Sequence, residues 1–353
     1  MTVSIAIDEY ACAPEAAIRE VLARIDRSSY LFQIVVDQEG HLLGTVTDGD
    51  IRRAMLHGFG LDGVAGDCMQ TQPKTGRLGD AAANQEALSG LGSLRAFLPI
   101  LDSGGVVREI LVAADGPGIG SAIVMAGGPG TRLGKRTETT PKPLLPVGGR
   151  PILDHILTAL ETAGVERIVI SVHYLPEQIE AFVATRSNGA AIELIREPHR
   201  LGTAGALGQL GGNSPREPML VVNGDVITKV DFAALHDFHH RQAFDGTIAV
   251  ARYDVDIPFG VIRYGEDGRF EAIEEKPKVS NFVAAGVYYL SPEYLSLVPP
   301  GKPMDMPELL NLGKRIGLRT GLFPIHEYWT DVGRSDDLDA ADAHHRHATR
   351  AEK

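Results

Sequence analysis

Short apolar runs alternate with amphipathic stretches over the last two thirds of the chain. Periodic helical patterns over 151–163 and 176–184 separate runs that carry almost no charge, as buried parallel strands do. The runs are 121–126, 167–172, 219–222 and 247–250. This alternation predicts an α/β fold with an open, mostly parallel sheet, and ligands at the carboxyl ends of its strands.

The first third of the chain contains an internal repeat. Segments 34–46 and 99–111 each show the pattern of a strand, a tight turn and a second strand. Asp37 and Asp102 occupy equivalent turn positions, as do Gly40 and Gly105, with one offset of 65 residues (102 − 37 and 105 − 40). Helical patterns lie beside them at 14–24 and 81–91.

These patterns divide the chain into two parts. We predict a duplicated βαββα module over residues 1–116, with repeats of about 1–60 and 61–116, and a second domain over 119–353. Glycine and proline at 116–118 mark the linker between them, which we expect to act as a hinge.

A glycine-rich segment follows the apolar run at 121–126. Glycine amides can surround phosphate oxygens, and Arg132 and Lys142 add positive charge close by. The order of residues fits neither the G-x-x-x-x-G-K-S/T phosphate loop nor the G-x-G-x-x-G loop of dinucleotide-binding folds. The segment therefore predicts a different kind of polyphosphate site.

This segment resembles the G-G-x-G-T/S-R-L signature of sugar-1-phosphate nucleotidyltransferases. The family's downstream P-K-P-L-L-P-V element stands intact at 141–147, and the resemblance covers about two thirds of the chain. It implies that Arg132 holds the β- and γ-phosphates of a nucleoside triphosphate and Lys142 the α-phosphate region. The implied nucleotide-binding residues are Ala126, Gly127, Gly128, Gly130, Thr131, Arg132, Lys142, Gly202, Thr203, Ala204, Asn223 and Gly224.

Two aspartates stand in elements that match the metal-binding motifs of the same family. Asp225 ends an Asn-Gly-Asp sequence that resembles the family's G-D element, and Asp331 lies in a match to its W-x-D-x-G element. The resemblance implies that both hold Mg²⁺, which suits a reaction in which a sugar-phosphate oxygen attacks an anionic α-phosphorus. Arg132, Lys142, Asp225, Lys276 and Asp331 are therefore the expected catalytic residues.

The acceptor site is implied by a third motif. Glu275-Lys276-Pro277 resembles the family's E-K-P element, in which lysine holds the sugar phosphate and the preceding glutamate takes sugar hydroxyls. By the same resemblance Gly260 contacts the sugar and Gly286 lies near it.

The segment 201–207 resembles the G-T-A loop of the guanylyltransferase branch. The expected substrates are GTP and a hexose or amino-hexose 1-phosphate, such as mannose- or glucosamine-1-phosphate, for glycan or nonulosonate biosynthesis. This step from fold to substrate is analogy. A uridylyl- or cytidylyltransferase of the same fold, and a non-catalytic subunit that senses nucleotide sugars, remain alternatives.

The repeated module resembles a tandem pair of CBS domains. That family grips a nucleotide ribose with an S/T-x-x-D element, which Thr47 and Asp50 provide in the first repeat, whereas Val112 replaces the hydroxyl residue in the second. Thr47 and Asp50 also fit a helix capping box, so a regulatory nucleotide and a scaffold role both stay open. CBS pairs commonly associate, and we expect a homo-oligomer.

Composition limits the other possibilities. A net charge of −12 argues against nucleic-acid binding, and Cys12 and Cys68 are too few for a disulfide framework. No apolar stretch approaches the ~20 residues of a membrane span, and the first residues lack a basic region. We therefore expect a cytoplasmic protein that does not bind membranes.

Overall fold

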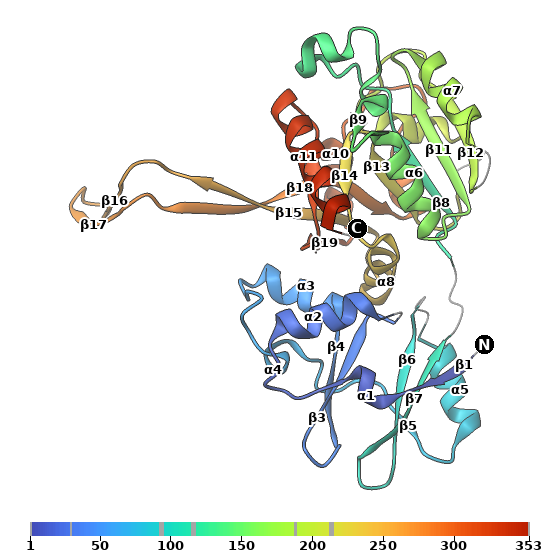
Figure 1. Ribbon diagram of the computed structural model, residues 1–353, viewed down its shortest axis with the longest axis vertical. Coiled ribbons are helices and arrows are strands. Elements are labelled where there is room, and N and C mark those ends of the chain that lie inside the picture. Colours follow the sequence, from blue (N-terminus) through green and yellow to red (C-terminus); the bar gives the residue numbers. More distant parts are fainter. Residues whose placement is uncertain are drawn as a thin grey trace.

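The protein consists of two lobes and a long arm. The computed structural model describes residues 2–28, 30–91, 95–113, 118–186, 189–211 and 215–351, with side chains to residue 346. In Figure 1 the N-terminal lobe lies below the larger C-terminal lobe, and a thin two-stranded ribbon projects to one side.

The N-terminal lobe contains two small sheets. One sheet has the strand order β2-β3-β4 and the other β1-β7-β6-β5. Because β1 pairs with β7, the first strand of the chain completes the sheet of the second repeat. The elements are β1 (Thr2–Ile5), α1 (Ile7–Tyr10), β2 (Ala11–Cys12), α2 (Ile18–Arg27), β3 (Phe32–Val36), β4 (Leu42–Thr47), α3 (Asp48–Leu56), α4 (Ala65–Cys68), β5 (Gly76–Arg77), α5 (Ala81–Ser89), β6 (Phe97–Leu101) and β7 (Val107–Ala113).

The two repeats pack through equivalent residues. The ring of Phe32 stacks on that of Phe97, 65 positions later, with centroids 3.7 Å apart. The Leu42 N–H donates to Gly105 O at 3.2 Å, and the equivalent Val107 N–H donates to Gly40 O at 3.1 Å. Such reciprocal contacts give the lobe an internal pseudo-twofold symmetry.

The C-terminal lobe is built on a seven-stranded sheet of order β12-β11-β8-β13-β18-β15-β19. Strands β12, β11, β8 and β13 are parallel, and only β18 runs antiparallel to both of its neighbours. Its strands are β8 (Ser121–Met125), β11 (Arg167–Val172), β12 (Ala191–Arg196), β13 (Met219–Asn223), β15 (Gly246–Asp256), β18 (Lys278–Leu290) and β19 (Thr320–Ile325). The predicted α/β fold with a mostly parallel sheet is confirmed.

Apolar clusters cover both faces of this sheet. Along β8, Ala122 and Val124 belong to the cluster on the α6 face, while Ile123 belongs to the cluster on the α10 face. The helices of this lobe are α6 (Ile152–Thr162), α7 (Pro176–Ala184), α8 (Phe232–Gln242), α9 (Pro292–Ser296), α10 (Met306–Arg315), α11 (Ser335–Ala351) and the 3₁₀ turns η1 (Thr131–Thr137), η2 (Lys142–Leu144) and η3 (Gly205–Gln209). None of the described helices combines the length and apolar character that crossing a bilayer requires.

Three two-stranded pairs complete the lobe. They are β9 (Pro146–Val147) with β10 (Arg150–Pro151), β14 (Val226–Thr228) with β20 (Trp329–Asp331), and β16 (Val261–Tyr264) with β17 (Phe270–Glu274). Strands β16 and β17 form the tip of the projecting ribbon, which β15 and β18 connect to the sheet (Figure 1). We call residues 252–282 the arm.

A buried ion-pair network joins the two lobes. Arg52 of α3 is only 1% exposed and donates to Asp48 at 2.6 Å and to Glu327 of the other lobe at 2.7 Å. Its guanidinium lies 3.9 Å from the centroid of the Phe323 ring. Residues 116 and 117 of the predicted linker lie outside the described residues, and the expected hinge stays a prediction. The contacts of Arg52 join the two lobes away from that linker.

Helix α8 contains a buried histidine that makes the fold sensitive to acid. His239 is 2% exposed and shares a 2.9 Å hydrogen bond between Nδ1 and Thr247 Oγ1. Burial, with the nearby His240, lowers the pKa of His239 from 6.5 to about 3. The unfolded chain therefore binds more protons below pH 6.5, so stability falls as the pH decreases.

We expect the unfolding free energy to lose about 2 kcal/mol at pH 5 through His239. His239→Asn, which keeps a polar group at the Nδ1 position, should flatten this pH dependence in urea titrations. His57→Asn, at an exposed position, is the matched control. Parallel curves for wild type and His239→Asn would contradict the assignment.

Candidate active site

A pocket of about 220 Å³ opens at the carboxyl edge of the parallel strands. This edge is where ligands bind in open α/β sheets. The residues that line it come from the ends of β8 and β13, from the loop after β12 and from the start of α10: Met125, Gly127, Gly128, Glu197, Arg200, Leu201, Gly202, Thr203, Asn223, Asp225 and Asp305. The predicted glycine-rich segment and the Asn-Gly-Asp element are thus brought to one site.

The glycines after β8 are needed for close approach. A Cβ on Gly127 would lie 2.6 Å from Glu197 Oε1, and a Cβ on Gly224 would lie 2.8 Å from Met125 O. Gly130 has φ of +64°, a left-handed conformation that favours glycine. A Cβ on Gly128 would have no neighbour within 4 Å among the described residues, so the loop is open to a ligand there.

Two carboxylates meet on neighbouring short strands. In the β14–β20 pair Asp331 lies opposite Val226, and the Val332 N–H donates to Asp225 O at 3.0 Å. The ammonium of Lys142, whose side chain is 8% exposed, forms an ion pair with Asp225 and lies 3.9 Å from Asp331 Oδ1. Burial raises the pKa of Asp331, and the neighbouring Asp225 raises it further. A cation is therefore held between two carboxylates that repel each other.

The donor set at this position fits Mg²⁺. Asn223 Oδ1 is buried and has no hydrogen-bond partner among the residues that the structure describes. Carboxylate and amide oxygens are the ligands that hard divalent cations prefer. Asp225 and Asp331 therefore have the chemistry expected of a metal site, with a free acceptor beside them.

Arg132 lies close to the carboxylate pair. It belongs to η1 and is exposed, and a Cβ on Gly333 would lie 3.7 Å from its guanidinium and 3.8 Å from Asp331 Oδ1. The positive charges of Lys142 and Arg132 oppose the upward shift in the pKa of Asp331. Thr131 begins the same exposed turn, and Ala126 is anchored by an N–H bond of 2.9 Å to Ser171 O. Arg132, Lys142, Asp225 and Asp331 thus share one region.

Two acidic residues that the sequence analysis missed shape the loop at 201–205. Glu197 Oε2 accepts from the Leu201 N–H at 3.0 Å, and Asp305 Oδ1 accepts from the Thr203 N–H at 3.0 Å. The N–H groups of Ala204 and Gly205 both donate to Met304 O at 3.0 Å. In the sequence, only their positions could have indicated a role at the site: Glu197 directly follows β12, and Asp305 directly precedes α10.

The residues expected to bind the sugar phosphate are divided between two places. Gly286, with φ of +72°, lies at the pocket, where its Cβ would come within 2.8 Å of Asn223 Nδ2. Gly260, Glu275 and Lys276 lie on the arm instead, where a Cβ on Gly260 would lie 3.1 Å from Glu275 Oε2. None of these three lines the pocket in its own chain.

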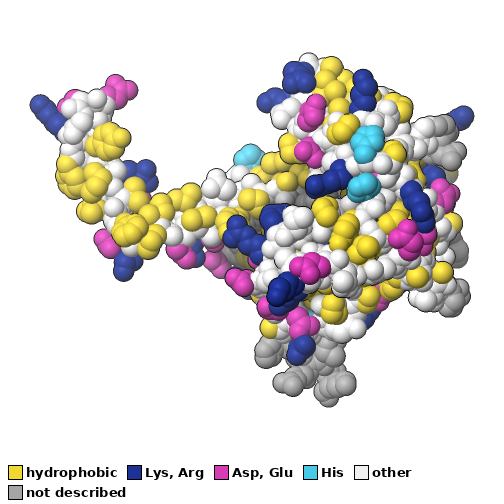
Figure 2. All heavy atoms as spheres, turned by 90° about the horizontal axis from the view of Figure 1, so that it is seen from above, with side chains coloured by type: hydrophobic (Ala, Val, Ile, Leu, Met, Phe, Trp, Pro, Cys, Tyr) yellow, Lys and Arg dark blue, Asp and Glu magenta, His cyan; other side chains and the backbone are white. Residues whose placement is uncertain are grey.

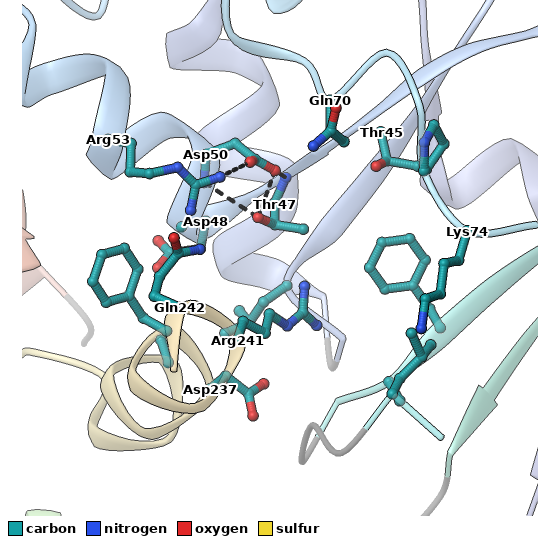
Figure 3. Close-up of a pocket in the computed structure, with 18 of the residues that line it drawn as sticks. Thr45, Thr47, Asp48, Asp50, Arg53, Gln70, Lys74, Asp237, Arg241 and Gln242 are labelled. Atoms are coloured by element: carbon teal, nitrogen blue, oxygen red, sulfur yellow. Dashed lines mark hydrogen bonds and ion pairs between the residues drawn. The ribbon is translucent and has the colours of Figure 1, made fainter. Parts of the chain in front are cut away.

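Thr47 and Asp50 form the capping box at the start of α3. The Asp50 N–H donates to Thr47 Oγ1 at 3.2 Å, and the Thr47 N–H donates to Asp50 Oδ2 at 2.8 Å. Both residues also line a second cavity, of about 390 Å³, between α3 and α8 (Figure 3). The structural and the binding interpretations therefore apply to the same residues.

Comparison with known proteins identifies the family. Residues 121–347 match the nucleotidyl transferase family, and residues 4–57, the first of the two repeats, match the CBS domain. The chain therefore belongs to the nucleotidyl transferase family, as the motifs predicted.

The chain is 34% identical over 223 residues to the mannose-1-phosphate guanylyltransferase catalytic subunit beta of Drosophila pseudoobscura pseudoobscura, covering 62% of this chain and 60% of the relative. It is 33% identical over 227 residues to the mannose-1-phosphate guanylyltransferase of Mycobacterium tuberculosis, covering 62% of each. The chain thus spans about 60% of the length of these relatives.

Among solved structures, HddC from Yersinia pseudotuberculosis, complexed with GMP-PN, superposes with a TM-score of 0.51 at 25% identity. The match covers 64% of this chain and 98% of that protein. The chain therefore shares the fold of HddC over about two thirds of its length.

Proposed function

We propose that the chain transfers a nucleoside monophosphate from a nucleoside triphosphate, with GTP favoured, to a sugar 1-phosphate and releases pyrophosphate. The observation that carries this proposal is the meeting of Asp225 and Asp331 around Lys142, beside an open glycine-rich loop. Relatives named as mannose-1-phosphate guanylyltransferases support GTP and a hexose 1-phosphate as the substrates.

Each residue has a role that its position allows. Arg132 is exposed and binds the β- and γ-phosphates of the triphosphate. The ammonium of Lys142 leaves its carboxylate partner, donates to an oxygen of the α-phosphate and neutralises its charge. Asp225 and Asp331 would hold Mg²⁺, which supplies charge neutralisation at the reacting phosphate. Because the protein offers positioning and charge, no covalent intermediate is needed.

The proposal is tested by measuring pyrophosphate release over a grid of four nucleoside triphosphates and several sugar 1-phosphates. We expect the highest kcat/KM with GTP and a hexose or amino-hexose 1-phosphate. Preference for UTP or CTP would favour a uridylyl- or cytidylyltransferase of the same fold. Binding without release in every combination would favour a regulatory subunit.

The cavity between the lobes supports a second function, the binding of a regulatory nucleotide. Thr47, Gln70 and Lys74 reach it from the N-terminal lobe, and Asp237 and Arg241 reach it from α8 (Figure 3). A ligand there would contact both lobes, so its binding would be coupled to how the N-terminal lobe sits on α8.

We expect a purine nucleoside monophosphate to stabilise the full chain by RT ln(1 + [L]/Kd), about 2.7 kcal/mol at one hundred times Kd. Lys74→Ala, which lies outside the active-site pocket, should reduce this thermal shift, whereas Arg19→Ala, at an exposed pair, should not. Equal shifts in all three proteins would leave the N-terminal lobe as a scaffold.

A further inference from the structure

The arm is an amphipathic ribbon that pairs with no further strand among the residues that the structure describes. Tyr253 and Val255 lie on one face with Val279, which is the direct cross-strand neighbour of Val255. The opposite face holds a polar network in which Arg252 and Ser280 both bond to Asp254. Asn281, opposite Tyr253, also lies on the first face, and Phe282, opposite Arg252, lies on the second. The first face is therefore the more apolar one and is suited to packing on another surface.

The exposure of the arm supports this interpretation. Of the fourteen large hydrophobic side chains that are exposed among the described residues, nine belong to the arm: Tyr253, Val255, Phe259, Ile262, Tyr264, Phe270, Ile273, Val279 and Phe282. Figure 2 shows these apolar side chains spread along the projecting ribbon. Because an isolated two-stranded ribbon is marginally stable in water, the arm needs a covering surface.

The active site, in turn, lacks residues that the arm carries. Lys278 stands eight residues before Gly286, which is beside the pocket, so roughly 25 Å of extended strand separate the two Cα atoms. Lys276 lies farther out still. At the pocket, Lys142 is already engaged by two carboxylates. Within one chain, the phosphate of the sugar 1-phosphate would therefore have no contact with Lys276, the cation proposed to bind it.

The register of the arm opposes closure onto its own pocket. The β15–β18 ladder runs without interruption from the Val250–Ala284 pair to the Asp256–Lys278 pair. Beyond Ala251 neither strand pairs with a third strand among the described residues. The register shift of this ladder, between Ile248 and Val250, lies at the base of the arm, and the ladder is regular from Val250 to Asp256. Bending the arm along this regular part would break ladder bonds, whereas reaching a second molecule leaves them intact.

We propose that two copies of this chain exchange arms, so that Glu275 and Lys276 of each copy complete the sugar-phosphate site of the other. The proposal rests on the proposed transferase function and adds that the active site is shared between chains. A reciprocal exchange is closed by twofold symmetry, as most homodimers are. Charge favours it, because Glu197, Asp225 and Asp305 line the pocket that Lys276 would approach.

Complementation between two inactive variants tests the exchange. Asp225→Asn damages the pocket and Lys276→Ala damages the arm, so each variant alone should lose activity. In a heterodimer with exchanged arms, one site combines intact Asp225 with intact Lys276. Co-expression with two affinity tags should therefore give purified heterodimers with about half of the wild-type kcat per dimer.

Matched pairs control for non-specific recovery. Asp225→Asn with Asp331→Asn places both lesions in the pocket, and Glu275→Ala with Lys276→Ala places both on the arm, so neither pair should recover activity. If Asp225→Asn and Lys276→Ala are each inactive alone and also inactive together in a stable heterodimer, arm exchange is overturned. The proposed role of Lys276 would remain intact. Full activity of Lys276→Ala alone would overturn that role, and the exchange with it.

Association provides an independent readout. Val255→Asp and Val279→Asp each place a charge on the exposed apolar face, at side chains that are 46% and 43% exposed and belong to none of the core clusters. We expect light scattering to show a dimer for the wild type and a monomer for each variant, with loss of activity in the monomer. A fully active wild-type monomer at assay concentration would overturn the proposal.

Discussion

Asp225→Asn and Asp331→Asn are each expected to reduce turnover by about 10³-fold or more while the protein stays folded. Each substitution removes one of the two carboxylates that meet around Lys142 at the pocket. Charge neutralisation by a bound metal contributes several kcal/mol to a phosphoryl-transfer barrier, and each 1.36 kcal/mol corresponds to about a factor of ten in rate.

The effect on stability should be small by comparison. The Asp331 side chain is 48% exposed and the Asp225 side chain 26%, so neither substitution opens a cavity in the core. Pyrophosphate release at saturating Mg²⁺, with urea unfolding of the same preparations, separates the two effects. Asp62→Asn, at a side chain that is 94% exposed, is the control. Near wild-type kcat in either pocket variant would contradict the metal assignment.

The sequence predicted the parts of the site that depend on local chain chemistry. Glycines at 127 and 130 are recognisable because only glycine allows the close approach of residue 127 to Glu197 and suits the left-handed turn at residue 130. Strands such as β11, bounded by Arg167 and Val172, were predicted from unbroken apolar runs that are buried on both faces of the sheet. Local pattern and tertiary environment agree in these segments.

Long-range contacts explain what the sequence did not predict. Glu197 and Asp305 act through backbone amides of the loop at 201–205, and Asp305 lies about one hundred positions away from it. The arm also resisted prediction, because alternation along 246–256 and 278–290 predicts strands but not whether a third strand will cover them. The contact of Arg52 with Glu327 of the other lobe was not predicted for the same reason, since 275 positions separate the two residues.

Arg52 is the residue whose loss should most affect the fold. Its guanidinium is shared by two carboxylates from different lobes, the buried Asp48 and the partly buried Glu327, and stacks on Phe323. Although burial opposes ionisation, Arg52 keeps the pKa of Glu327 at about 2. In the wild type this pair therefore stabilises the fold above about pH 4.5, and its contribution decreases as the pH falls toward 2.

Arg52→Met should destabilise the protein by about 3–5 kcal/mol at pH 7, because removing one partner of a buried ion pair leaves uncompensated charge. Without the guanidinium, burial raises the pKa of Glu327, so the contribution of Glu327 to stability increases as the pH falls. The loss of unfolding free energy relative to wild type should therefore be smaller at pH 5 than at pH 7. Adding Glu327→Gln should recover part of the loss at pH 7, whereas Arg19→Ala, at an exposed pair, should stay within about 0.5 kcal/mol of wild type. Thermal and urea unfolding of the four proteins measure these differences. An Arg52→Met protein as stable as wild type at pH 7 would show that other contacts hold α3 of the N-terminal lobe against β19.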